Sequence, residues 1–71
     1  MAKRVVIGIQ ELRLRIKWVV AQVTGGPAGD GTTEPGGKHV IFTRHGKAIG
    51  AFVPMDWYRA KAEQDGEPTD L

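Results

Sequence analysis

The sequence contains no cysteine and no serine, and these absences exclude several classes of site. Without cysteine the chain can form no disulfide and offers no thiolate for a structural zinc ion. The two histidines, His39 and His45, have no cysteine or serine nucleophile to activate, as a catalytic triad requires. They stand at opposite ends of a predicted strand about 20 Å long, too far apart to share a metal ion within one subunit. We therefore predict no enzymatic activity, no metal and no cofactor.

Long apolar runs are also missing. No run approaches the roughly 18 apolar residues of a membrane span, and the first residues lack the apolar core and cleavage site of a secretory leader. We expect a cytoplasmic protein that binds neither membranes nor a small-molecule substrate. Its 71 residues suffice for one domain, whose core alone contributes roughly 3–5 kcal/mol. With disulfides and zinc excluded, dimerisation is the expected source of added stability.

Charge is unevenly distributed along the chain, although the net charge is only +2. In residues 1–24 and 38–50 taken together, basic side chains outnumber acidic ones by seven. From residue 51 onward acids outnumber bases by three. A chain that is basic in front and acidic behind is expected to use its two ends for different partners.

Two elements are expected before the first break in the sequence. The β-branched run 5–9 predicts a strand, and residues from about 11 to 24 predict a helix that ends at a Gly-Gly-Pro stop signal. One helix face carries apolar residues at helical spacing: Leu12, Ile16, Val19, Val20 and Val23. The opposite side carries a second apolar stripe: Leu14, Trp18 and Ala21.

A helix that is apolar on two faces needs two partners. We expect the first face to cover the sheet and the stripe of Leu14, Trp18 and Ala21 to form the dimer interface. The alternative is that Trp18 folds over the edge of its own domain.

Residues 25–37 contain six glycines and two prolines, a composition that predicts a flexible loop without regular structure. A phosphate-binding loop is the alternative for a glycine-rich segment. Such a loop would need the GxxxxGK[ST] pattern and would open a helix, and this segment does neither.

The remaining residues predict a hairpin and a short helix. Runs 39–44 and 47–53 are strand-like and are joined by His45-Gly46, a pair suited to a two-residue turn. Pro54 ends the second strand, residues 55–64 read as a helix, and residues 65–71 form a short acidic tail. The order βαββα predicts an α+β domain over residues 1–64, a three-stranded sheet with helices packed on it.

The hairpin and its surroundings resemble a known family. The relevant segments are a first strand, Glu11-Leu12-Arg13 at a helix start, Val40–Lys47, the Val53-Pro54 pair and the helix start Asp56-Trp57-Tyr58. Over about residues 5–62 the chain resembles the Phd/YefM antitoxins of type II toxin–antitoxin systems. The most specific element is the Ile-x-Thr-Arg-His-Gly-Lys hairpin, followed by Val-Pro and an aromatic pair.

The resemblance implies a dimeric transcriptional repressor that binds palindromic operator DNA of its own operon. It also implies a C-terminal segment that neutralises a RelE-like or Doc-like toxin. Arg13 and Arg44 match the DNA-contacting arginines of the family, and arginine is the usual reader of base edges. Further DNA contacts are expected from Lys3, Arg4, Lys17, His45 and Lys47, and toxin contacts from Trp57 and Tyr58.

Four features depart from the family pattern. Gln10 stands where a Ser or Thr helix cap is usual, and Arg15 replaces a common Asn. The loop 25–37 is longer than usual, and only about seven residues follow the last helix. Two alternatives stay open: a protein-interaction module that binds through the acidic end, and a solitary transcriptional regulator of the same fold without a toxin.

Overall fold

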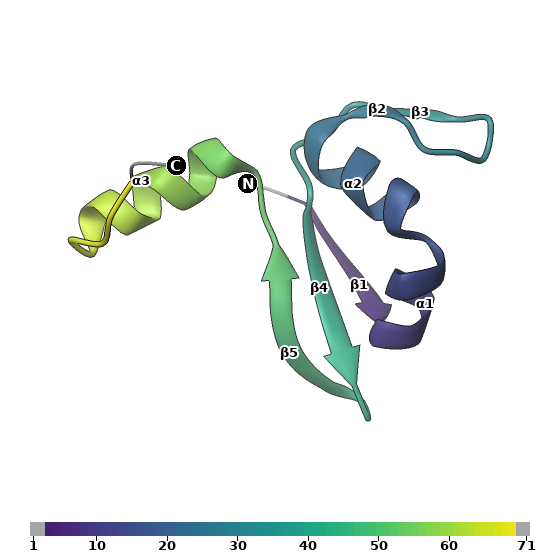
Figure 1. The fold of residues 1–71 in the computed structure, drawn as a ribbon, viewed down its shortest axis with the longest axis horizontal. Coiled ribbons are helices and arrows are strands. Elements are labelled where there is room, and N and C mark those ends of the chain that lie inside the picture. Colours follow the sequence, from purple (N-terminus) through teal and green to yellow (C-terminus); the bar gives the residue numbers. More distant parts are fainter. Residues whose placement is uncertain (1–2, 70–71) are drawn as a thin grey trace.

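The computed structural model describes residues 3–69 (Figure 1). Residues 1–2 and 70–71, the outer ends of the predicted domain and tail, lie outside the described residues. The elements in chain order are β1 (Arg4–Gly8), α1 (Ile9–Leu14), α2 (Ile16–Thr24), β2 (Gly26–Pro27), β3 (Thr33–Glu34), β4 (His39–Arg44), β5 (Lys47–Phe52) and α3 (Met55–Gln64). No helix among the described residues is both long enough and apolar enough to cross a membrane.

The predicted three-stranded sheet is confirmed, and its strands lie in the order β1-β4-β5. β1 runs parallel to β4, with Val6 opposite Ile41, and β5 runs antiparallel to β4. Parallel neighbours need a crossover connection, which α1 and α2 supply on one side of the sheet (Figure 1). The predicted hairpin is confirmed: His45 and Gly46 have φ values of 53° and 75°, the two positive values that a type I′ turn requires.

The predicted helix over residues 11–24 is wrong at its start and in its middle. Helical structure begins at Ile9, so β1 ends at Gly8 and the position before the helix is Gly8 instead of Gln10. At Arg15 the backbone leaves the helical region, with φ −124° and ψ 38°, and this divides the segment into α1 and α2. Arg13 therefore lies in the last turn of a short helix, not in the first turn of a long one.

The core forms between the helices and one face of the sheet. Its buried members are Ile7, Leu12, Val19, Val23 and Val40. The face predicted to cover the sheet is only partly buried, since Ile16 and Val20 are each 50% exposed.

The stripe assigned to a dimer interface does not form one exposed surface, so the assignment is corrected at Ala21, while an interface at Leu14 and Trp18 stays a prediction. Ala21 is buried within its own chain, at 2% exposed. Trp18 is half-buried and packs against the core, as in the alternative reading, and the Arg15 guanidinium lies 4.3 Å from its ring centroid. Leu14 alone of the three is widely exposed, at 82%.

The expectation that residues 25–37 hold no regular structure is also wrong. β2 and β3 pair as a small antiparallel ribbon, and Ala28 between them is buried. The segment returns along the end of α2, where the Gly37 and Lys38 amides donate to the carbonyls of Val23 and Gln22 at 2.8 and 3.0 Å. Such a close return requires glycine at residue 36, because a Cβ there would lie 2.6 Å from the Gly25 nitrogen.

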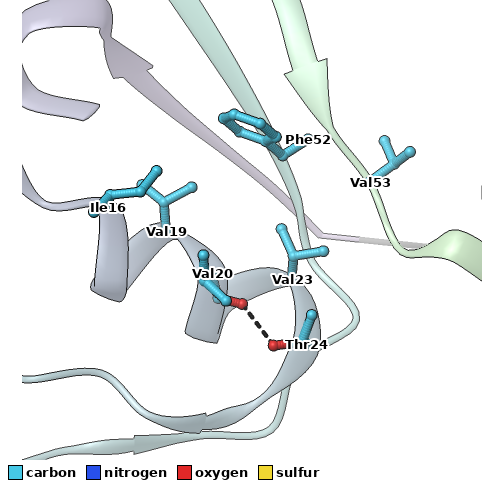
Figure 2. Close-up of a pocket in the computed structure, with 7 residues that line it drawn as sticks. All are labelled: Ile16, Val19, Val20, Val23, Thr24, Phe52 and Val53. Carbon is cyan, nitrogen blue, oxygen red and sulfur yellow. Dashed lines mark hydrogen bonds between the residues drawn. The ribbon is translucent and has the colours of Figure 1, made fainter. Parts of the chain in front are cut away.

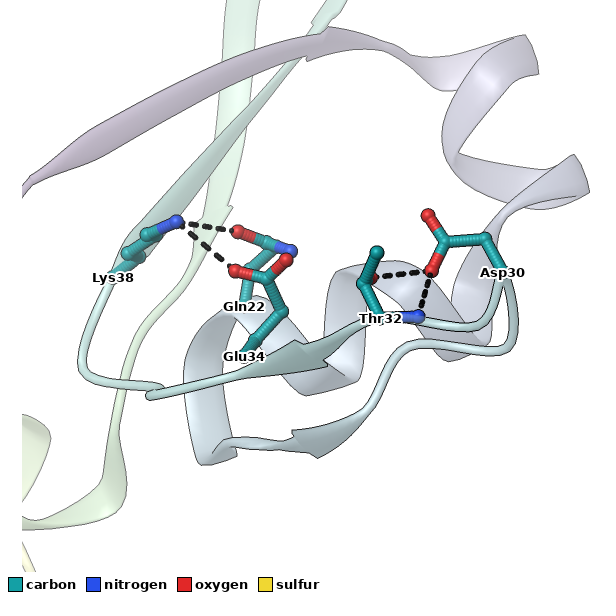
Figure 3. Close-up of polar contacts among 5 residues, drawn as sticks. All are labelled: Gln22, Asp30, Thr32, Glu34 and Lys38. Atoms are coloured by element: carbon teal, nitrogen blue, oxygen red, sulfur yellow. Dashed lines mark hydrogen bonds and ion pairs between the residues drawn. The ribbon is translucent and has the colours of Figure 1, made fainter.

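A polar contact fastens this segment to the helix (Figure 3). The Lys38 ammonium donates to Gln22 Oε1 at 2.9 Å and to Glu34 Oε1 at 3.3 Å. Gln22 is 1% exposed, so its side-chain oxygen is removed from water in the folded protein. Without Lys38 this oxygen would be buried with no hydrogen-bond donor, which is unfavourable. These partners come from α2, β3 and the residue before β4, which explains why local composition did not predict the contact.

The last helix, α3, projects away from the sheet and the other helices (Figure 1). Pro54 precedes it in an extended conformation, with φ −61° and ψ 144°. The Trp57 ring packs edge-to-face on His39 at the start of β4, with centroids 4.8 Å apart. Beyond the helix, the Glu67 amide donates to the Ala62 carbonyl at 2.8 Å, so the start of the acidic tail folds back on α3.

Candidate nucleic-acid interface

The hairpin turn places three of the predicted DNA-binding residues side by side. Arg44 ends β4, His45 is the first turn residue, and Lys47 begins β5 directly opposite Arg44 in the strand register. All three are exposed. The tight turn thus concentrates cationic and titratable side chains at one end of the sheet.

A cavity of about 350 Å³ opens beside this turn, where β1 ends and α1 begins. It forms because β1 and β4 are parallel, so that Gly8 and Thr43 are neighbours at the same edge of the sheet. Its lining is the segment Gly8–Gln10 and the segment Thr43–Gly46. The sequence predicted the second segment as a binding site but not the first, because the parallel pairing that joins them depends on the crossover.

Arg13 lies in the last turn of α1, a helix that packs against β1 and β4 and begins at this cavity (Figure 1). Its side chain is exposed. Within residues 3–69, Arg13, Arg44 and Lys47 form no ion pair with a described acid, whereas Arg15 pairs with Glu11 and Lys38 with Glu34. Arg44 and Lys47 therefore give the hairpin end a positive charge that no described acid neutralises.

Lys17 is separated from Arg13 by the break at Arg15, so the two do not form one continuous helical stripe. The Lys17 stem lies against Gly29 in the loop, where an added Cβ would come within 3.1 Å of its Cδ. A DNA contact by Lys17 stays a prediction.

Lys3 and Arg4 lie at the opposite end of β1 from the hairpin turn. Arg4 is the first residue of β1 and faces His39, while Gly8 reaches the cavity. Four residues of strand separate the two positions, about 13 Å. The expected basic arm is not free of the sheet, because the Lys3 carbonyl accepts a hydrogen bond from the His39 amide at 2.9 Å.

The predicted toxin-binding residues are adjacent on α3 and remain accessible, Trp57 at 42% and Tyr58 at 40% exposed. Successive helix residues point about 100° apart, so the two side chains face different directions. Trp57 faces His39, and the Lys61 ammonium lies 5.7 Å from its ring centroid.

An apolar groove of about 200 Å³ lies between α2 and the end of β5, and sequence reasoning missed it (Figure 2). Its lining residues are Ile16, Val19, Val20, Val23, Thr24, Phe52 and Val53. The groove exists because α2 packs over β4 and leaves β5 uncovered on that side. Periodicity does not reveal it, since nothing in the pattern says which strand the helix lies over.

Comparison of the chain with protein-family models, with curated proteins and with solved structures finds no match.

Proposed function

We propose that two copies of this chain form a repressor that binds palindromic operator DNA of its own operon, and that each copy neutralises a toxin, as Phd/YefM antitoxins do. The observation that supports DNA binding most strongly is the set of exposed cations at the hairpin end. Arg44 lines the open cavity beside the turn, Lys47 pairs with it in the strand register, and neither has a described acid partner. Arg13, on the helix α1 that begins at this cavity, has none either. Phosphates attract such groups irrespective of sequence, and arginine can also read base edges.

The residues have distinct roles in this proposal. Arg44 and Arg13 donate to base edges, because the planar guanidinium offers paired donors. Lys47 and His45, on either side of the turn glycine, contact phosphates. Lys3 and Arg4, at the other end of β1, add sequence-independent attraction to phosphates, which weakens as the salt concentration rises.

Toxin binding is proposed for α3 and the residues after it. Toxins that act on RNA need a basic surface, and an acidic partner segment complements such a surface. Trp57 and Tyr58 add exposed aromatic area, and aromatics are preferred anchors of protein interfaces. An open reading frame for a small basic protein beside this gene would support the assignment, whereas its absence would favour a solitary regulator.

The DNA-binding proposal is tested by a mobility-shift titration on the region upstream of the gene, with a random duplex of equal length as competitor. Specific binding is typically about 10³-fold or more tighter than binding to unrelated sequence. Equal affinity for both duplexes would rule out operator binding, and the protein-interaction module would take its place.

A further inference from the structure

The groove between α2 and β5 is an uncovered part of the protein's main apolar layer. Ile16 and Val20 are 50% exposed on its helix side, and Phe52 is 41% exposed on its strand side. Phe52 packs on Phe42, with centroids 5.4 Å apart, so the floor of the groove continues into the core. Figure 2 shows the groove side chains of α2 together with Phe52 and Val53 at the end of β5.

The helix α3 has a complementary free face. Met55 and Tyr58 are three residues apart, so they lie on one side of the helix, and they are 42% and 40% exposed. Trp57 points to another side and packs on His39. An apolar groove and an unpartnered apolar helix face thus occur in the same small chain.

The connection is too short for α3 to fill the groove of its own chain. Only Val53 and Pro54 separate β5 from α3, and Val53 itself lines the groove. A helix packed on a sheet lies about 10 Å from it, so α3 would have to reverse direction within two residues. Pro54 is extended and directs the helix away (Figure 1). Short connections of this kind favour exchange of an element between copies.

Charge also favours a second copy as the occupant. In residues 9–24 three basic residues stand against one acid, and Lys17 is the neighbour of the groove residue Ile16. In residues 55–69 four acids stand against two bases. Placing α3 of one copy beside α2 of another therefore brings opposite net charges together.

We propose that two copies exchange α3, so that Met55 and Tyr58 of each copy lie in the groove formed by Ile16, Val20 and Phe52 of the other. This rests on the two-fold dimer of the proposed function and specifies its interface. The arrangement is isologous, because the same groove and the same helix are used on both copies. It covers Tyr58 and leaves Trp57 as the aromatic side chain of α3 that can contact a toxin.

The absence of native cysteine allows a direct cross-linking test. Val20→Cys and Tyr58→Cys proteins, one carrying a size tag, are mixed, refolded together and oxidised with diamide. Exchange predicts that the mixture forms tagged–untagged disulfide dimers in several-fold higher yield than either protein forms dimers alone. A disulfide needs Cα atoms about 4.4–6.8 Å apart, so it reports on direct proximity. The matched control is Leu14→Cys mixed with Tyr58→Cys, which should remain at the background yield.

Sedimentation of glutamate variants provides an independent measurement. Val20→Glu places a charge in the groove and should convert the dimer to monomer at tens of micromolar, while Leu14→Glu, at an exposed site outside the groove, should not. A monomeric wild-type protein would overturn the exchange. So would a dimer in which Val20 and Tyr58 do not cross-link, or one that Leu14→Glu disrupts. The DNA titration is independent of these tests. If the protein prefers its upstream region but fails them, only the exchange of α3 is refuted and the proposal of DNA binding stands.

Discussion

At the scale of single residues, Gly50 shows how the sheet accommodates an aromatic ring. Gly50 is opposite Phe42 in the strand register, and a Cβ at residue 50 would overlap the Phe42 ring. Phe42 packs on the core and on Phe52, so moving its ring disturbs both contacts. We predict that Gly50→Ala lowers the free energy of unfolding by about 1–3 kcal/mol. Ala48→Gly, in the same exposed strand, is the control and should lower the free energy of unfolding by less than Gly50→Ala does. Gly46→Ala would be a poor control because Gly46 has a positive φ. If urea denaturation shows that Gly50→Ala leaves the stability unchanged, the packing of Phe42 against Gly50 is contradicted.

A second residue-scale prediction concerns Asp30 at the tip of the β2–β3 segment. The Thr32 hydroxyl and the Thr32 amide both donate to Asp30 Oδ1, and these hydrogen bonds lower the pKa of the carboxyl from its ordinary 3.8 (Figure 3). Because the pKa of Asp30 is lower in the folded state, its hydrogen bonds stabilise the fold fully at a pH above the pKa of the unfolded state. This stabilisation is lost as the pH falls through the pKa of the folded state. Carboxyl NMR titration should show Thr32→Val raising the pKa of Asp30, while Thr33→Val leaves it unchanged. Equal titration in all three proteins would show that these hydrogen bonds do not persist in solution.

At the scale of elements, the β2–β3 segment is expected to support α2 and not merely to connect it to β4. Ala28 is 3% exposed and Ala21 on α2 is 2% exposed. A carboxylate at residue 28 would be buried without a partner, so Ala28→Asp should destabilise the fold by at least about 1–3 kcal/mol. Thr33→Asp, at an exposed position of the same segment, is the control. Equal unfolding midpoints for the two variants would mean that the segment does not pack.

The same element marks the limit of what the sequence could predict. The hairpin was predictable because His45-Gly46 is a local signal for a turn with two positive φ values. The attachment of the β2–β3 segment to α2 was not, because it includes a hydrogen bond from Lys38 to Gln22, sixteen residues earlier in the chain. The break at Arg15 was also missed, since neither proline nor glycine occurs there to announce it.

At the scale of the whole molecule, the candidate site was predictable in its residue types and not in its assembly. Arg44, His45 and Lys47 follow from their positions around the turn. The participation of Gly8–Gln10 follows only from the parallel alignment of β1 and β4, which sets Gly8 beside Thr43. The location of the groove required knowing that α2 lies over β4, which the apolar pattern of the helix does not specify.

The central claim is that the hairpin end of this protein binds DNA with sequence preference. The most direct measurement is a fluorescence-anisotropy titration of the labelled upstream duplex with wild type, Arg44→Ala and Lys61→Gln at two salt concentrations. Lys61→Gln removes a charge from α3, away from the hairpin, and should bind like wild type. Arg44→Ala should lose about 1–3 kcal/mol, roughly 5-fold to 150-fold in affinity, and should discriminate less between the upstream duplex and a random one. Equal binding by Arg44→Ala and Lys61→Gln, with undiminished discrimination, would contradict the account.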